Sequence, residues 1–71
     1  MEGFLGTRIQ NAREMKNLTS KEAAQLIGVS ASTWSLYENN KRTPSVDTLK
    51  LIAKKLEVSM DYLAGLKNEK L

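Results

Sequence analysis

The apolar residues of this chain recur at helical spacing, in short segments separated by polar and glycine-containing turns. Leu5, Ile9 and Ala12 lie at positions i, i+4 and i+7, which predicts a first helix over residues 5–16. Asn17 follows, and asparagine tolerates the left-handed conformation that often ends a helix. No segment alternates convincingly between apolar and polar positions, as a half-buried strand would. The pattern therefore predicts an all-α protein.

Capping residues divide the middle of the chain into a second and a third short helix. Thr19 and Glu22 have the spacing of a capping box, which predicts a helix that begins after Thr19 and ends at Gly28. Ser30 is a suitable N-cap for a third helix that runs to about residue 39. The residues expected to point inward from this part of the chain are Ala23, Ala24, Ile27, Val29, Trp34 and Tyr37.

A polar loop that ends at Pro44 separates the third helix from two further helices. Asn40 is expected to adopt the left-handed conformation at the start of this loop. Ser45 caps the fourth helix, and Ser59 caps a short fifth helix that ends near Gly65. The apolar residues of these helices are Val46, Leu49, Ile52, Ala53 and Leu56 in the fourth, and Met60 and Leu63 in the fifth.

The composition allows one compact domain and argues against an enzyme. We assign the domain to residues 1–66 of the 71 and expect residues 67–71 to form a frayed tail. The chain has no cysteine and no histidine, which excludes disulfides and removes the commonest general base and zinc ligand. The carboxylates have cap or surface explanations, and no glycine-rich loop is suited to cradle a phosphate. The sequence therefore predicts no catalytic residue, no metal site and no cofactor.

The apolar segments are too short to indicate a membrane partner. None approaches the roughly 20 residues needed to span a bilayer. The first residues, MEGFLGTR, lack the pattern of a secretory signal, so we expect a cytoplasmic protein. The net charge of +3 and the isoelectric point near 9.4 weakly favour a polyanionic partner, because Lys and Arg side chains neutralise phosphates.

The turn between the second and third helices gives the strongest indication of function. Each helix is about two turns long, too short to be stable alone in water, so the two must pack together. Ala24 is small enough to let them approach, and Gly28 can adopt the positive φ of a sharp turn. A resemblance to the phage-repressor (Cro-like, XRE) helix-turn-helix family covers residues 18–63, from LTSKEAAQLIGVS through YENNKRTPS to KKLEVSMDYL.

This resemblance implies a domain that binds double-stranded DNA as a homodimer. In such domains the third helix lies in the major groove and the second crosses the phosphate backbone. Matching positions assign base contacts to Ala31, Ser32, Ser35 and Leu36. Phosphate contacts are assigned to Ser20, Ser30, Asn39, Lys41 and Arg42, with Arg8 and Lys21 as further candidates. The implied function is transcriptional repression at a pseudo-palindromic operator whose half-sites lie about one helical turn apart.

The third helix departs from the family pattern in its groove-facing residues. It lacks the Gln, Arg and Lys side chains that bind base edges bidentately. Its serines can donate or accept, whereas Ala31 and Leu36 offer only apolar contact, best matched to a thymine methyl group. We therefore predict a modest, thymine-containing readout that depends partly on DNA shape. Ser20 stands where the family usually has Gln, so its phosphate contact has a shorter reach.

Three residues have a structural interpretation beside a functional one. Trp34 is either a core residue or a base-stacking residue, and its helical phase, shared with Val29 and Tyr37, favours the core. Arg13 and Glu38 are either solvated charges or, as the resemblance implies, a partly buried salt bridge that ties the first helix to the third. Loss of one partner of such a bridge would strand a charge.

The fourth and fifth helices offer a candidate dimer surface. Leu51 lies opposite the apolar stripe of the fourth helix, either as an ordinary exposed leucine or as a contact between two copies. Lys54 and Lys55 are interpreted as a solvated face rather than as DNA contacts. The candidate dimer residues are Leu51, Met60, Tyr62 and Leu66.

A second interpretation of the same fold is a protein-interaction module. An antitoxin of this fold binds a toxin and only secondarily its own promoter. The weak groove-facing chemistry and the apolar Leu36 and Leu51 would suit a toxin partner. A toxin gene immediately beside this one would favour the antitoxin.

Overall fold

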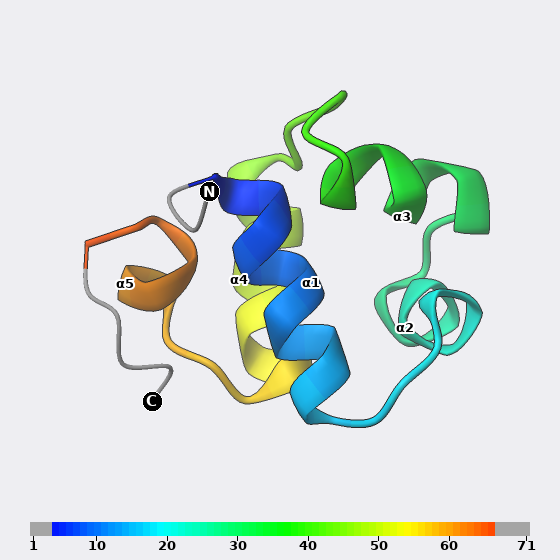
Figure 1. The fold of residues 1–71 in the computed structure, drawn as a ribbon, viewed down its shortest axis with the longest axis horizontal. Coiled ribbons are helices and arrows are strands. Elements are labelled where there is room, and N and C mark those ends of the chain that lie inside the picture. The colour runs from blue at the N-terminus through cyan, green and yellow to red at the C-terminus, as the bar shows by residue number, and fades with distance from the viewer. Residues whose placement is uncertain (1–3, 67–71) are drawn as a thin grey trace.

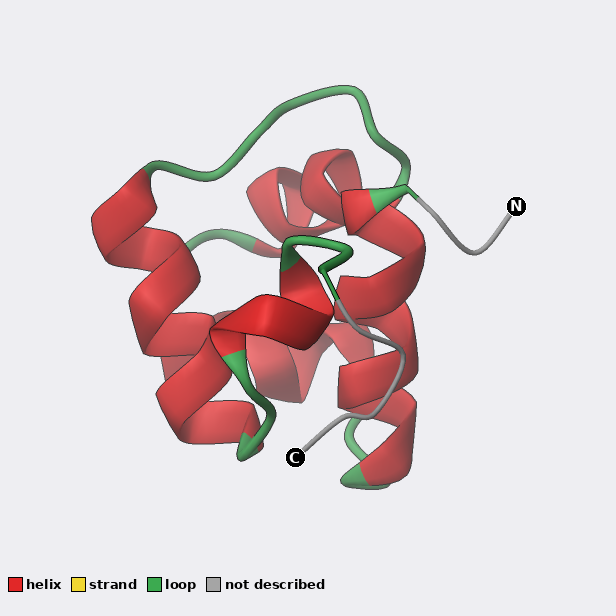
Figure 2. Ribbon diagram, turned by 90° about the vertical axis from the view of Figure 1, so that its left-hand side faces the viewer, coloured by secondary structure: helices red, strands yellow, loops and turns green. Residues whose placement is uncertain are grey.

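Five helices make up the part of the chain that the computed structural model describes, residues 4–66 (Figure 1). They are α1 (Leu5–Met15), α2 (Ser20–Ile27), α3 (Ala31–Glu38), α4 (Val46–Leu56) and α5 (Met60–Leu63). Over this range only loops join them, so the predicted all-α, five-helix fold is confirmed (Figure 2). Within the same residues no helix is long and apolar enough to cross a membrane. The predicted tail, residues 67–71, lies outside the described residues.

Side-chain caps begin four of the five helices at the predicted residues. Thr19 and Glu22 form the capping box: the Thr19 backbone N–H donates to Glu22 Oε1 at 2.8 Å, and the Glu22 N–H donates to Thr19 Oγ1 at 3.1 Å. Ser30, Ser45 and Ser59 each accept a hydrogen bond from the backbone N–H three residues later. Each such cap contributes about 1 kcal/mol to the stability of its helix.

Left-handed residues end the helices where the sequence predicted an end. The φ angle is positive at Asn17, Gly28, Asn40 and Gly65. Glu57, after α4, also has a positive φ of 58°, which the sequence did not indicate. Its carboxylate pairs with the Lys16 ammonium group at the end of α1, so the ends of α1 and α4 are linked.

The helices surround one hydrophobic core. α1 and α4 lie at the centre, with α2 and α3 to one side and α5 to the other (Figure 1). The largest fully buried side chains are Ile9, Trp34, Ile52, Leu56, Tyr62 and Leu63. The core interpretation of Trp34 is therefore confirmed. Val46 was wrongly included in the apolar stripe of α4: it is 66% exposed, because it occupies the first position of the helix, and the residues packed on the core begin with Leu49.

Candidate nucleic-acid interface

The turn between α2 and α3 is built around the backbone conformation of Gly28. α2 ends there with a φ of 90°, and the N–H groups of Gly28 and Val29 both donate to the Ala24 carbonyl, at 2.8 and 3.0 Å. A Cβ at Gly28 would meet no atom within 4 Å, so glycine is required by the φ angle rather than by space. Ser30 then caps α3, so only residues 28–30 separate the two helices.

α3 has one buried face and one exposed face. Trp34 and Tyr37 point into the core, where their rings pack edge to face with centroids 6.3 Å apart. The four predicted base-contact residues lie together on the exposed face: Ala31, Ser32, Ser35 and Leu36. The inner residues thus hold the helix in place, and the outer residues remain available to a partner.

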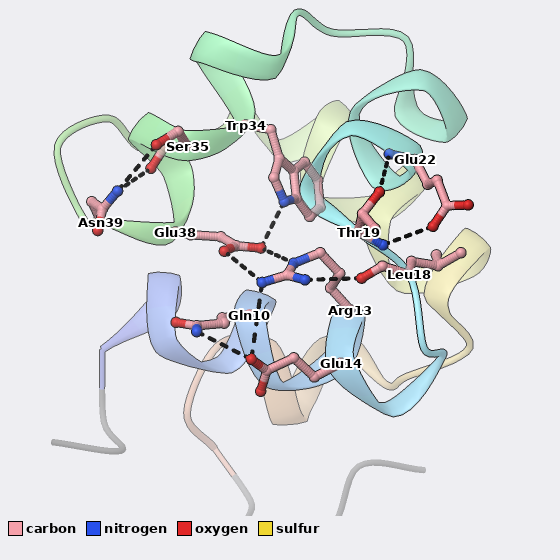
Figure 3. A network of polar contacts seen from close by, with 10 residues as sticks. All are labelled: Gln10, Arg13, Glu14, Leu18, Thr19, Glu22, Trp34, Ser35, Glu38 and Asn39. Carbon is pink, nitrogen blue, oxygen red and sulfur yellow. Dashed lines mark hydrogen bonds and ion pairs between the residues drawn. The ribbon is translucent and has the colours of Figure 1, made fainter.

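A buried carboxylate joins α3 to α1 (Figure 3). Glu38 receives the Arg13 guanidinium at two points, Nε to Oε2 at 2.6 Å and Nη2 to Oε1 at 3.2 Å. This is the predicted salt bridge, and its side chains are only 14% and 9% exposed. The hydrogen bond to Glu38 is the main cause that raises the pKa of Arg13.

The same carboxylate also receives the indole of Trp34, which sequence reasoning missed. Trp34 Nε1 donates to Glu38 Oε2 at 2.6 Å. The signal was present, because Trp34 and Glu38 are four residues apart and therefore neighbours on one helix face. Arg13 completes the network by donating from Nη1 to the Leu18 carbonyl at 2.9 Å, in the α1–α2 turn.

The end of α3 also rests directly on the first turn of α1, at a glycine that the sequence did not single out. A Cβ on Gly6 would lie 2.5 Å from the backbone oxygens of both Tyr37 and Glu38. The Gly6 N–H donates to Asn40 Oδ1 at 2.9 Å, so the loop after α3 is tied to the start of α1. Only a residue without a side chain permits this approach.

The predicted phosphate-contact residues differ in their exposure and in whether their polar groups already bond within the domain. Ser20 begins α2 and is half-buried, whereas Lys21, Lys41 and Arg42 are exposed and form no ion pair with any residue between 4 and 66. Ser30 Oγ accepts from the Thr33 N–H at 3.0 Å and donates to Thr33 Oγ1 at 2.9 Å, so its hydroxyl is used by the cap. The described residues contain no cluster of acidic, histidine or cysteine side chains that could hold a metal ion.

Two predicted surface residues are buried against each other instead. Arg8 is 5% exposed, donates from Nη1 to the Tyr62 carbonyl at 3.1 Å, and lies 4.9 Å from the centre of the Tyr62 ring. Tyr62 is 1% exposed, and its hydroxyl accepts from Asn11 Nδ2 at 3.3 Å. Because α5 packs on α1 through these contacts, Arg8 is wrong as a phosphate contact and Tyr62 is wrong as a dimer residue.

The remaining residues of the predicted dimer surface have unequal exposure. Leu51 and Met60 are half-buried and pack against the domain's own core, whereas Leu66 is 77% exposed. The expectation that Leu51 lies opposite the packed stripe is therefore only partly met.

Comparison with known proteins places this geometry in a family. Residues 9–63 match the family model described as Helix-turn-helix. The chain is 39% identical to the HTH-type transcriptional regulator ImmR of Bacillus subtilis (strain 168). The match extends over 61 residues, or 86% of this chain. It is also 31% identical over 62 residues to the antitoxin PezA of Streptococcus pneumoniae serotype 4, covering 87% of the chain and 39% of that protein.

Two solved structures of DNA complexes share the fold. The P22 c2 repressor bound to a synthetic operator superposes with a TM-score of 0.79 at 28% identity, over 84% of this chain and 91% of that one. SinR bound to DNA superposes with a TM-score of 0.76 at 35% identity, over 83% of this chain and 95% of the SinR chain. The chain spans about half the length of the curated relatives it matches, 48% in the case of ImmR. By the extent of these matches, the chain belongs to the helix-turn-helix family of repressor type.

Proposed function

We propose that this chain is the DNA-binding unit of a transcriptional repressor and that α3 enters the major groove. The observation that carries the proposal is the division of α3 into two faces. Trp34, Tyr37 and the Glu38 carboxylate fix the inner face to the core and to α1, while the outer face takes no part in the core. The family membership and the two neighbours solved with DNA support DNA as the partner of this domain.

Cationic and polar groups beside α3 would bind the phosphates. Lys41 and Arg42 follow the helix and Lys21 lies in the first turn of α2, all exposed. Such contacts position a domain on the duplex without reading its sequence. Ser20, as the first residue of α2, would add its hydroxyl and backbone N–H groups near the positive end of that helix.

The outer face of α3 supplies modest chemistry for reading bases. Ser32 and Ser35 present hydroxyls, and Ala31 and Leu36 present apolar surface suited to a thymine methyl group. We expect a thymine-containing half-site in which sequence-dependent DNA shape contributes part of the specificity. The domain would act in the cytoplasm, perform no catalysis and require no cofactor.

Two copies would read a pseudo-palindromic operator with half-sites about one helical turn apart. With Tyr62 buried, the contact between copies would use the accessible parts of Leu51 and Met60 together with Leu66. If Leu51→Glu leaves self-association unchanged, Leu51 is not part of the interface.

The decisive experiment is selection of bound duplexes from a random pool at moderate salt, followed by sequencing. Enrichment of a two-fold symmetric motif would support a dimeric sequence reader and supply the operator. Binding that is salt-sensitive but enriches no motif would contradict sequence-specific recognition and direct attention to a protein partner.

The relation to the antitoxin PezA favours a second candidate, a domain that binds a toxin and only secondarily its own promoter. Leu36 is 39% exposed on α3 and would suit an apolar protein contact. A toxin gene next to this one would support this function. So would a Leu36→Ala variant that loses the partner but retains DNA binding.

A further inference from the structure

The outer face of α3 carries one large apolar side chain, that of Leu36. All eight residues of α3 lie in the described part of the chain, and among them Leu36 is the only large apolar residue that is exposed, at 39%. Trp34 and Tyr37, on the same helix, are buried. A single exposed leucine is ordinary on a protein surface, so its use depends on what lies beside it.

Two cationic residues are attached to the backbone of Leu36. The N–H groups of Lys41 and Arg42 both donate to the Leu36 carbonyl oxygen, at 2.9 and 3.2 Å. Their side chains are exposed and pair with no acidic side chain within residues 4–66. An apolar side chain beside such cations suits a partner that is anionic and also carries apolar groups. The major groove of DNA has both, because phosphates border it and thymine methyl groups project into it.

A leucine side chain has no donor and no acceptor, so it can distinguish bases only by the apolar groups that they present. The apolar group in the major groove is the methyl group on C5 of thymine. Uracil and cytosine carry hydrogen at C5, whereas 5-methylcytosine carries the same methyl group as thymine on the same carbon. Thymine and 5-methylcytosine are therefore equivalent to Leu36.

The serine hydroxyls on the same face do not restore the distinction between these two bases. Beside the methyl group, thymine presents an acceptor at C4 and 5-methylcytosine presents an amino donor. Ser35 Oγ accepts one hydrogen bond from Asn39 Nδ2, at 3.2 Å, and keeps a second lone pair and its proton. A serine hydroxyl can thus donate to the one base or accept from the other.

We infer that Leu36 reads the C5-methyl group of a pyrimidine rather than thymine as such; the inference rests on the proposed function. Methylation of a cytosine at C5 then strengthens binding at the position that faces Leu36, so the affinity of the domain depends on the methylation state of the DNA. Burial of one methyl group is worth about fourfold in affinity.

The test measures the affinity of the wild type for duplexes that differ by one methyl group. In one half-site of the selected operator, each thymine is replaced in turn by uracil. At the position that responds, the thymine–adenine pair is then replaced by a cytosine–guanine pair with and without the C5-methyl group. We expect uracil to bind about fourfold more weakly than thymine there, and 5-methylcytosine about fourfold more tightly than cytosine.

A leucine-to-alanine variant separates direct contact from DNA shape, which a methyl group can also change. In Leu36→Ala both preferences for the methyl group should disappear. Leu26→Ala is the matched control, because Leu26 is 43% exposed but lies on α2, and this variant should keep both preferences. Circular dichroism verifies that each variant is folded. If Leu36→Ala does not fold, NMR of the wild-type complex decides, since the contact predicts a nuclear Overhauser effect between the C5-methyl protons and the Leu36 methyl protons.

Three results would overturn the inference while leaving the proposed function in place. One is a wild type whose affinity no uracil substitution changes. Another is a preference for the methyl group that persists in Leu36→Ala, which would assign it to DNA shape or to another residue. The third is 5-methylcytosine that binds no better than cytosine where thymine binds better than uracil. A wild type that selects no motif overturns the proposed function itself, and the inference with it.

Discussion

Replacing Glu38 with glutamine changes one atom and disrupts the network that attaches α3 to α1. The carboxylate accepts two hydrogen bonds from Arg13, at 2.6 and 3.2 Å, and one from Trp34 at 2.6 Å. Glutamine keeps one acceptor oxygen but directs an NH2 group at neighbours that only donate. The variant Glu38→Gln therefore loses hydrogen bonds and leaves the Arg13 charge without its counter-charge.

The expected loss can be estimated from the burial of the pair. A hydrogen bond to a charged group is worth about 1.5–3 kcal/mol, and breaking a buried ion pair costs about 3–5 kcal/mol. The Arg13 and Glu38 side chains are 14% and 9% exposed, and in the variant Arg13 keeps its hydrogen bond to the Leu18 carbonyl. We therefore expect a loss at the lower end of the range for a buried ion pair, about 3 kcal/mol. For a domain of this size the Tm should fall by about 12–24 °C.

Urea unfolding followed by tryptophan fluorescence and circular dichroism measures this loss, and Trp34 is the only tryptophan. The matched control is Glu14→Gln, since Glu14 also lies near Arg13, at 4.0 Å, but is 56% exposed. The control should lose less than about 0.5 kcal/mol. The reasoning is refuted if Glu38→Gln is no less stable than this control.

Four further outcomes are expected. Gly6→Ala should cost about 2–3 kcal/mol in thermal unfolding, because its Cβ would lie 2.5 Å from two backbone oxygens. Gly28→Ala meets no atom but must keep a φ of 90°, so the same assay should show a smaller loss of about 1–2 kcal/mol. The hydrogen bond and charge of Lys16 lower the pKa of Glu57 from 4.5, so the pair's stabilisation is full above pH 4.5 and is lost as the pH falls through the lower folded-state pKa. The melting temperature of Glu57→Gln should therefore lie below that of the wild type at neutral pH and approach it only at acidic pH. Lys41→Ala should weaken binding to all duplexes alike and reduce the slope of log K against log salt by about 0.9, and an unchanged slope would remove it from the phosphate contacts.

Features that depend on neighbouring residues could be predicted from the sequence. The Thr19–Glu22 capping box, the serine caps and the glycine turn at Gly28 each involve residues within four positions of one another. Their geometry is set by local hydrogen bonds and by the φ angles that each residue type tolerates. The elements and the two faces of α3 follow from these local signals and from helical phase.

Features that depend on distant contacts could not be predicted in the same way. Arg8 has the charge expected of a phosphate contact, but its guanidinium lies on Tyr62, 54 residues away. Gly6 cannot be singled out from the sequence, because glycine is required there by the close approach of the α3 backbone, which is distant along the chain. Charge and hydropathy describe a residue alone, whereas burial is decided by which helix packs on it.

The two faces of α3 have a consequence for how such a domain diversifies. Substitutions at exposed positions away from special contacts usually change stability by less than about 0.5 kcal/mol, whereas changes in a packed core cost several times more. Residues 31, 32 and 36 contact neither Glu38 nor Arg13 through any hydrogen bond between residues 4 and 66. Under the proposed function, duplication and drift could exchange one operator for another at these positions while the scaffold stayed the same.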